Sequence, residues 1–149
     1  MIGIAGRARW KLALTLMVTL LVGYYDRLNV SLALPLIAAD FGWTASETRH
    51  YGSLLMSLFY VGYGLGNIFL SPLGARFGLK RSLLIIIVLW SLFTALGAWA
   101  SSMVMVFIAS RLLLGLSEGI HFPLMSQLTK HWFPPQERSR GNGIWIAGL

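Results

Sequence analysis

The sequence contains no cysteine and carries little charge. Because it has 0 Cys among 149 residues, a disulfide framework, a thiolate metal site and a catalytic thiol are excluded within it. Charged residues make up 11% of the chain, whereas a water-soluble domain carries about 25%. Hydrophobic residues make up 56%, in runs that reach the roughly 18 residues needed to cross a bilayer. The composition predicts a polytopic membrane protein.

The net charge of +7 does not indicate a nucleic-acid partner. The basic residues fall in short clusters between the apolar runs, so they offer no continuous basic face to a phosphate backbone. The sequence shows no arrangement of serine, histidine and acid, and no spacing typical of metal ligands. We therefore predict no enzymatic activity, no metal and no cofactor.

Four complete spans and the beginning of a fifth are predicted, which makes the chain an all-α membrane protein. The run after the basic N-terminus is too long for a signal peptide, so we interpret it as an uncleaved first span. The last run is too short to cross a bilayer, and we expect residues 1–149 to be the N-terminal part of a longer transmembrane domain. The predicted spans are residues 12–38, 45–70, 82–100 and 103–128, followed by the start of a fifth at about residue 143.

Local signals predict where two of these elements begin and end. Thr44 followed three residues later by Glu47 matches a capping box at the start of the second span. Pro134 and Pro135 end any helix that precedes them. Residues 131–143 are therefore predicted to form a loop.

The basic residues predict the orientation in the membrane. Most of the 12 Lys and Arg residues lie on one side if the four spans alternate, which places the N-terminus in the cytoplasm. Trp10 and Trp132 then lie at the inner interface, and Trp43 and Trp99 at the outer one, as aromatic belts prefer. We expect a multi-pass protein of a bacterial-type inner membrane, with the lipid bilayer as its partner.

Ionisable residues lie inside two predicted spans: Asp26 and Arg27 in the first, Arg111 and Glu118 in the fourth. The helical rise places both carboxylates near the midplane of the bilayer. Adjacent residues point about 100° apart around a helix, so Asp26 and Arg27 each require another partner. Such residues mark ligand or proton sites more often than structural ion pairs, although Arg111 fits equally well as a structural partner of Glu118.

A fixed cation near titratable carboxylates is typical of a proton-coupled site for an organic anion. Arg27 keeps its charge and suits a carboxylate ligand. Burial in hydrocarbon favours the protonated form of carboxyl groups, which makes Asp26 and Glu118 candidate proton-coupling residues. His121 could relay protons, but its position favours a hydrogen-bonding role within the helix bundle. Tyr63 is a weaker candidate for a residue lining the cavity.

Glycines predict close helix packing. Gly62, Gly64 and Gly66 lie inside an apolar span with no preceding strand, which excludes a nucleotide-binding loop. Gly115 and Gly119 lie on the polar stripe of the fourth span and allow a helix or a substrate to approach closely.

Together these stretches resemble the major facilitator superfamily and, within it, the anion:cation symporter family. The segment YYDRLNVSLALPLIAADFGWT is similar to the family's opening helix and SLFYVGYGLGN to its second. RLLLGLSEGIHFP is similar to the fourth helix and WFPPQERSRGNG to the loop leading into the fifth. The resemblance implies the first four to five helices of a major-facilitator-type bundle, and it implies the remaining helices of the same transporter as partners.

The resemblance also implies roles for single residues. It associates Arg27, with the aromatic residues Tyr24 and Tyr63, with the substrate, and it associates Asp26 and Glu118 with protons. The expected function is import of a small organic anion, such as a sugar acid or another carboxylate, with the proton as coupling ion.

Two further elements of the family map onto this chain. Arg111 corresponds to the fourth-helix arginine, as a charge partner or a second anion contact. The cytoplasmic gate loop of the superfamily usually reads G-x-x-x-D-R-x-G-R-R, and here it reads SPLGARFGLKR. Ser71 replaces the first glycine and Ala75 the aspartate, which affects gating kinetics rather than the fold. The gate-loop residues that remain are Arg76, Gly78, Lys80 and Arg81.

Two other functions stay open at this stage. One is a membrane fragment without transport activity, either truncated or acting as a scaffold for other helices. The other is an anion exchanger without proton coupling. The intramembrane carboxylates favour coupling over exchange, and the end at Leu149 favours truncation over a scaffold.

Overall fold

The computed structural model describes residues 2–99 and 103–149, with side chains from residue 6 onward. Within these ranges the chain is helical between short connections and contains no strand, which confirms the predicted all-α class. The predicted end of the third span at residue 100 lies outside the described residues. In chain order the elements are α1 (Ile2–Phe41), α2 (Ala45–Leu65), η1 (Gly66–Leu70), α3 (Ser71–Arg76), α4 (Leu79–Trp99), α5 (Val104–Trp132), η2 (Pro135–Glu137) and α6 (Arg138–Ile146).

Three stretches of described helix are long and apolar enough to cross a membrane: Ala45–Arg76, Leu79–Trp99 and Val104–Trp132. They correspond to the second, third and fourth predicted spans. The first predicted span, residues 12–38, lies within α1, which is not among these three stretches of the described chain. That span remains a prediction.

The chain forms two compact units, and each is described by itself. The first unit consists of the residues up to Asn29 together with Met125–Leu149. The second unit consists of Val30–Leu124. Helices α1 and α5 each contribute residues to both units.

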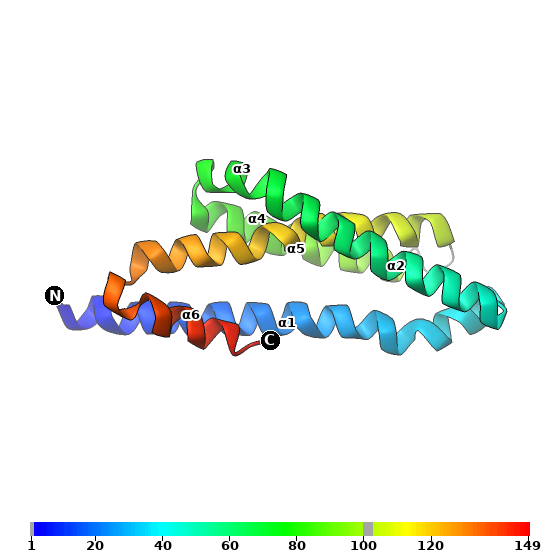
Figure 1. Cartoon of the computed structure of the whole chain (residues 1–149), viewed down its shortest axis with the longest axis horizontal. Coiled ribbons are helices and arrows are strands. Elements are labelled where there is room, and N and C mark those ends of the chain that lie inside the picture. The colour runs from blue at the N-terminus through cyan, green and yellow to red at the C-terminus, as the bar shows by residue number, and fades with distance from the viewer. Residues whose placement is uncertain (1, 100–102) are drawn as a thin grey trace. The chain divides into compact units, whose positions relative to one another are not determined.

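In the first unit, α6 lies alongside the N-terminal part of α1 (Figure 1). Arg9 forms an ion pair with Glu137 at 2.8 Å, which ties the start of α1 to η2. The Trp145 ring is 1% exposed, and its Nε1–H donates to Thr129 Oγ1 at 3.1 Å. These contacts attach η2 to α1 and α6 to the end of α5.

The connection predicted as a loop at residues 131–143 is largely helical. Helix α5 continues to Trp132 and ends before Pro134, while α6 begins at Arg138. The Arg138 guanidinium donates to two backbone carbonyls around the end of α5, at 3.0 and 3.2 Å. Because the last carbonyls of a helix lack partners within it, this side chain caps α5 and holds the following turn against it.

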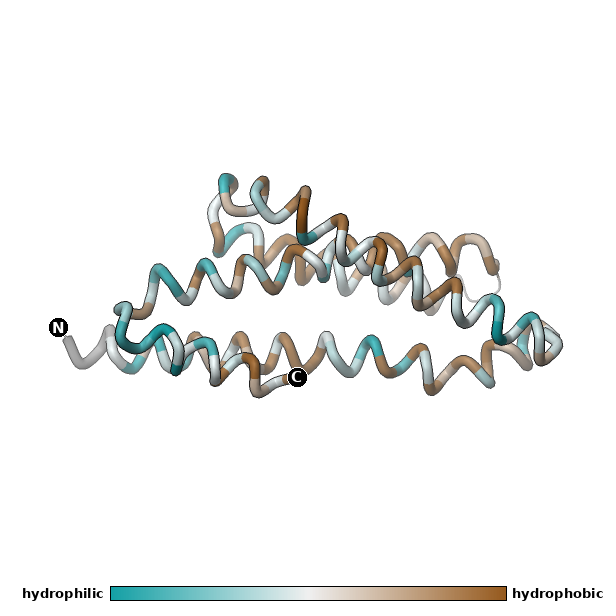
Figure 2. The backbone as a smooth tube through the Cα atoms, in the orientation of Figure 1, coloured by the Kyte–Doolittle hydropathy of each residue, from teal (hydrophilic) through white to brown (hydrophobic). Residues whose placement is uncertain are grey.

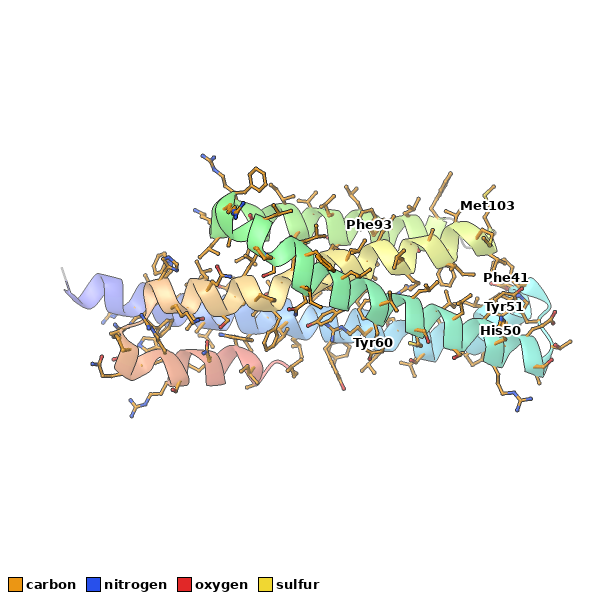
Figure 3. The ribbon with its side chains drawn as sticks, turned by 45° about the horizontal axis from the view of Figure 1, so that its top comes forward. Phe41, His50, Tyr51, Tyr60, Phe93 and Met103 are labelled. Atoms are coloured by element: carbon orange, nitrogen blue, oxygen red, sulfur yellow. The ribbon has the colours of Figure 1, made fainter. Side chains whose placement is uncertain are left out.

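In the second unit, the predicted capping box starts α2. The Thr44 backbone N–H donates to Glu47 Oε2 at 2.8 Å, and Thr44 Oγ1 accepts from the Glu47 N–H at 3.3 Å. The preceding turn is filled by stacked rings, with centroids 5.1 Å apart for Phe41 and Trp43 and 4.6 Å apart for Trp43 and Tyr51. Phe41 and Tyr51 thus both stack with Trp43 and lie near each other at one end of the helices (Figure 3). The stack fixes the hairpin between α1 and α2.

Backbone contact between α2 and α5 dominates the packing of the second unit. A Cβ added to Gly62 would meet the Leu112 carbonyl, and one added to Gly115 would meet the Phe59 carbonyl. Gly66 and Gly119 have equivalent close contacts with carbonyls of the opposite helix. The predicted role of these glycines in helix packing is therefore confirmed, and for Gly115 and Gly119 the close neighbour is a helix. The prediction is wrong for Gly64, where an added Cβ would meet no atom of another described segment within 4 Å.

The π-turn η1 separates α2 from α3, and proline accounts for it. Pro72 occupies the first turn of α3. A proline inside an α-helix removes one N–H and its ring pushes against the carbonyl four residues earlier. The wider turn relieves this crowding: the Ser71 N–H donates to the Gly66 carbonyl, five residues before it.

Hydrophobic residues follow nearly the whole length of α4 (Figure 2), and large apolar side chains of this helix are exposed. Water-soluble proteins rarely expose contiguous apolar surface of this kind, whereas a bilayer solvates it. The side chains of α4 that are more than half exposed include Leu84, Ile85, Val88 and Leu92.

We expect Gly62→Ala to destabilise the protein and Gly64→Ala not to do so. The new methyl group at residue 62 meets rigid backbone, and overpacking of this kind costs about 1–3 kcal/mol. At residue 64 the methyl group enters open space, and alanine is favoured over glycine in a helix by about 1 kcal/mol. The apparent melting temperature of each variant in detergent measures the difference. Equal melting temperatures for the two variants would contradict the close backbone contact.

Candidate functional site

The candidates of the first unit lie within one turn of α1. Tyr24 is 39% exposed, whereas Asp26 and Arg27 are half-buried. Asp26 and Arg27 each take part in an interaction. Since neighbours on a helix point about 100° apart, the acid and the base face different surroundings, and their separate partners remain a prediction.

The candidates on α5 in the second unit are buried. Glu118 is 3% exposed and Arg111 is 8% exposed. The two residues are seven positions apart, which is about 10 Å along one face of the helix. The Arg111 guanidinium carbon lies 5.5 Å from the centre of the Phe107 ring, one turn earlier, within cation–π range. This face of α5 therefore holds a permanent cation and a carboxylate out of water.

Close packing brings Tyr63 to the level of Glu118. Gly115 and Gly119 flank Glu118 on α5, and both abut the α2 backbone at Tyr63. The Tyr63 ring is half-buried against a cluster that includes Phe59. In contrast, Tyr60, one turn earlier, is 61% exposed and projects outward (Figure 3). Of these two tyrosines, Tyr63 is the one directed toward the helix contact.

An aromatic cluster completes the surroundings of this face. Phe59, Trp90 and Leu114 are buried together, with Tyr63 and Phe93 packed against them. Sequence reasoning missed Trp90, because it stands in an unbroken apolar run. Its position along the span could have indicated it: tryptophan prefers the membrane interfaces, whereas Trp90 lies near the middle of α4 (Leu79–Trp99).

The predicted gate residues surround the turn between α3 and α4. Arg76 ends α3, and Gly78 has φ of 99°, a left-handed conformation that favours glycine. Arg76 and Arg81 are exposed. The buried Ser82 donates from Oγ to the Gly74 carbonyl at 2.6 Å. Side chain and backbone together fix the turn that presents these cations.

The predicted site residues thus divide between the two units. Tyr24, Asp26 and Arg27 belong to the first. Within the second, the structure brings Tyr63 and Glu118 to one helix contact, while the predicted gate-loop residues lie at the end of α3 and the start of α4. Among the described residues, no group of three or more His, Cys, Asp and Glu side chains could hold a metal ion.

These features define the class: a helical integral membrane protein with ionisable side chains buried in its spans. The family model of the Major Facilitator Superfamily matches residues 16–149. The chain belongs to this superfamily of transporters. The resemblance noted in the sequence is therefore confirmed, and so is the assignment to transporters rather than enzymes.

Relatives of this chain carry transporter names. It is 35% identical over 142 residues to the "Probable anion transporter 3, chloroplastic" of Oryza sativa subsp. japonica, covering 95% of this chain and 27% of that protein. It is 32% identical over 123 residues to the "Probable sulfoacetate transporter SauU" of Cupriavidus necator, covering 83% and 27%. It is 30% identical over 140 residues to the "Uncharacterized transporter YybO" of Bacillus subtilis, covering 94% and 31%. The chain spans 27–31% of the length of these relatives.

We expect Ser82→Ala to loosen the turn between α3 and α4. It removes the hydrogen bond to the Gly74 carbonyl, worth about 1 kcal/mol. Trypsin, which cuts after the cations of this turn, should then cleave the protein several-fold faster. Ser91→Ala is the matched control, because Ser91 Oγ also donates to a carbonyl, that of Ile87 at 2.9 Å, but inside α4. Equal cleavage rates in the two variants would show that Ser82 does not fix the turn.

Proposed function

We propose that the transporter containing this chain moves a small organic anion, such as a sugar acid or another carboxylate, together with protons. The observation that carries the proposal is the α5 face on which Arg111 and Glu118 are buried at 8% and 3% exposure. Ionisable residues inside spans are costly and serve ligand or proton pathways by default. The relatives named as probable anion and sulfoacetate transporters support an anionic substrate.

The roles divide according to what each side chain can do. Arg27 cannot lose its proton and offers a planar pair of donors to a carboxylate, with Tyr24 and Tyr63 as additional contacts. Asp26 and Glu118 can bind and release protons. Each loaded proton neutralises a carboxylate that would otherwise repel the incoming anion, so anion and proton binding favour each other.

The remaining residues assist this cycle. Arg111 balances the charge of Glu118 or provides a second contact for the anion. Arg76, Gly78 and Arg81 form the cytoplasmic gate loop, if the basic clusters face the cytoplasm of a bacterial-type cell. We propose that orientation, with the N-terminus inside, on the positive-inside rule. Alternating access requires a second set of helices rocking around a site at the midplane, so further helices of the same transporter are the partners of these residues.

We expect Arg27→Lys to reduce anion uptake about tenfold or more. Lysine keeps the charge but cannot form the paired donor geometry, and a lost hydrogen bond to a charged group is worth about 1.5–3 kcal/mol. Uptake of labelled gluconate and of labelled sulfoacetate by cells producing the variant measures the loss. Arg7→Lys is the control, because Arg7 is exposed near the start of α1. Unchanged uptake in Arg27→Lys would exclude Arg27 as the anion contact.

We expect Glu118→Gln to uncouple transport from the proton gradient. Glutamine retains the shape of the side chain but cannot bind a transported proton. Counterflow of labelled against unlabelled anion should persist in proteoliposomes, while accumulation driven by a pH gradient should be lost. Asp40→Asn, at an exposed carboxylate near the end of α1, should leave both assays unchanged. Gradient-driven accumulation in Glu118→Gln would instead assign coupling to another residue, and its absence in the unaltered protein would indicate an exchanger.

A further inference from the structure

The α5 face carries a second titratable side chain next to Glu118. His121 lies one helical turn after Glu118 and is 4% exposed. The Trp90 ring on α4, itself 7% exposed, contacts the imidazole with the two rings nearly perpendicular, their centroids 6.1 Å apart and their planes at 73°. The histidine therefore lies one turn from a buried carboxylate on its own helix and contacts the buried aromatic cluster of the second unit.

Charge on His121 depends on these two neighbours. Imidazole is the side chain that ordinarily changes charge between pH 5 and 8. A proton on a buried imidazole is unfavourable unless other groups stabilise the cation. Glu118, three residues earlier on the same face, supplies an opposite charge. The indole of Trp90 supplies a ring that attracts cations.

No other buried group in the described part of the second unit duplicates this arrangement. On α5 the other charged residue of the face is Arg111, and on α2 the titratable group at this level is Tyr63. The charged residues of α4, Lys80 and Arg81, lie at its start, and Arg81 is about 14 Å along the helix from Trp90. The other acidic residues of this unit, Asp40 and Glu47, are exposed.

We propose that His121 is a proton-carrying residue of the transport site, paired with Glu118 and covered by Trp90. This role rests on the proposed function. One proton from water adds to the imidazole and gives an imidazolium beside the ionised Glu118. A second proton neutralises Glu118 and leaves the imidazolium, so that the α5 face gains positive charge as the pH falls. This added charge favours binding of an anion on the same face as Arg111.

The contact with Trp90 provides a test that is independent of transport. A protonated imidazole in contact with an indole quenches its fluorescence. The purified transporter in lipid nanodiscs should therefore lose emission between pH 8 and pH 5, and His121→Gln should remove that component of the change. Trp90→Phe should remove the same component, and combining both substitutions should have no further effect. His121→Asn provides a second neutral replacement if the glutamine variant does not fold.

The other histidines of the chain are matched controls. The chain has 3 His in total, and His50 and His131 are exposed. His50→Gln and His131→Gln should retain the component of the fluorescence change that Trp90→Phe removes. A pH response that is unchanged in His121→Gln and His121→Asn would overturn the proposal.

Transport assays separate this proposal from the proposed function. In His121→Gln we expect anion counterflow to persist and accumulation driven by a pH gradient to fall. Gradient-driven accumulation equal to that of the unaltered protein would show that Glu118 works without His121. If the unaltered protein transports no anion, the proposed function fails, while the fluorescence titration still decides whether His121 takes up a proton against Trp90.

Discussion

The second unit depends on the direct contact between the backbones of α2 and α5. Glycines on each helix face carbonyl groups of the other, so no side chain separates the helices at this point. In a bilayer, where apolar side chains gain little by leaving lipid, such close approach is a principal source of helix association. The contact also fixes chemistry, because Gly115 and Gly119 flank Glu118 and face α2 at Tyr63. The carboxylate and the tyrosine are therefore held at one level by the packing itself.

The same packing explains how charge is tolerated here. Arg111 and Glu118 are almost fully buried. The aromatic cluster that includes Trp90 of α4 packs against the same part of α5. A group of rings next to ionisable side chains gives an environment whose polarity changes with protonation, since a cation gains from the rings and a neutral imidazole does not. In a rigid, largely apolar setting, the electrostatic interaction between a bound proton and nearby charges is stronger than it would be in water. The backbone contact between α2 and α5 and the burial of these ionisable groups are therefore parts of one arrangement.

Much of this unit could be predicted from the sequence, because the signals are local. The capping box at Thr44 and Glu47 and the helix-packing glycines follow from spacing alone. Gly64 was mispredicted because spacing does not show which face of α2 meets a neighbour. Trp90 was missed because its role comes from α5, a contact distant in sequence. The helical connection after α5 was likewise missed, since it depends on Arg138 reaching back to the end of that helix.

The turn between α3 and α4 shows how a departure from the family pattern is accommodated. Where the superfamily usually places a carboxylate, this chain has Ala75, so the cations of the turn lack that neighbour. The turn nevertheless has a defined geometry, because Gly78 adopts the left-handed conformation and Ser82 donates to the Gly74 carbonyl. Gly78 and Ser82 thus determine the geometry of the turn, while Arg76 and Arg81 supply its charge. The missing carboxylate removes an attraction for Arg76 and Arg81 without removing the turn that presents them.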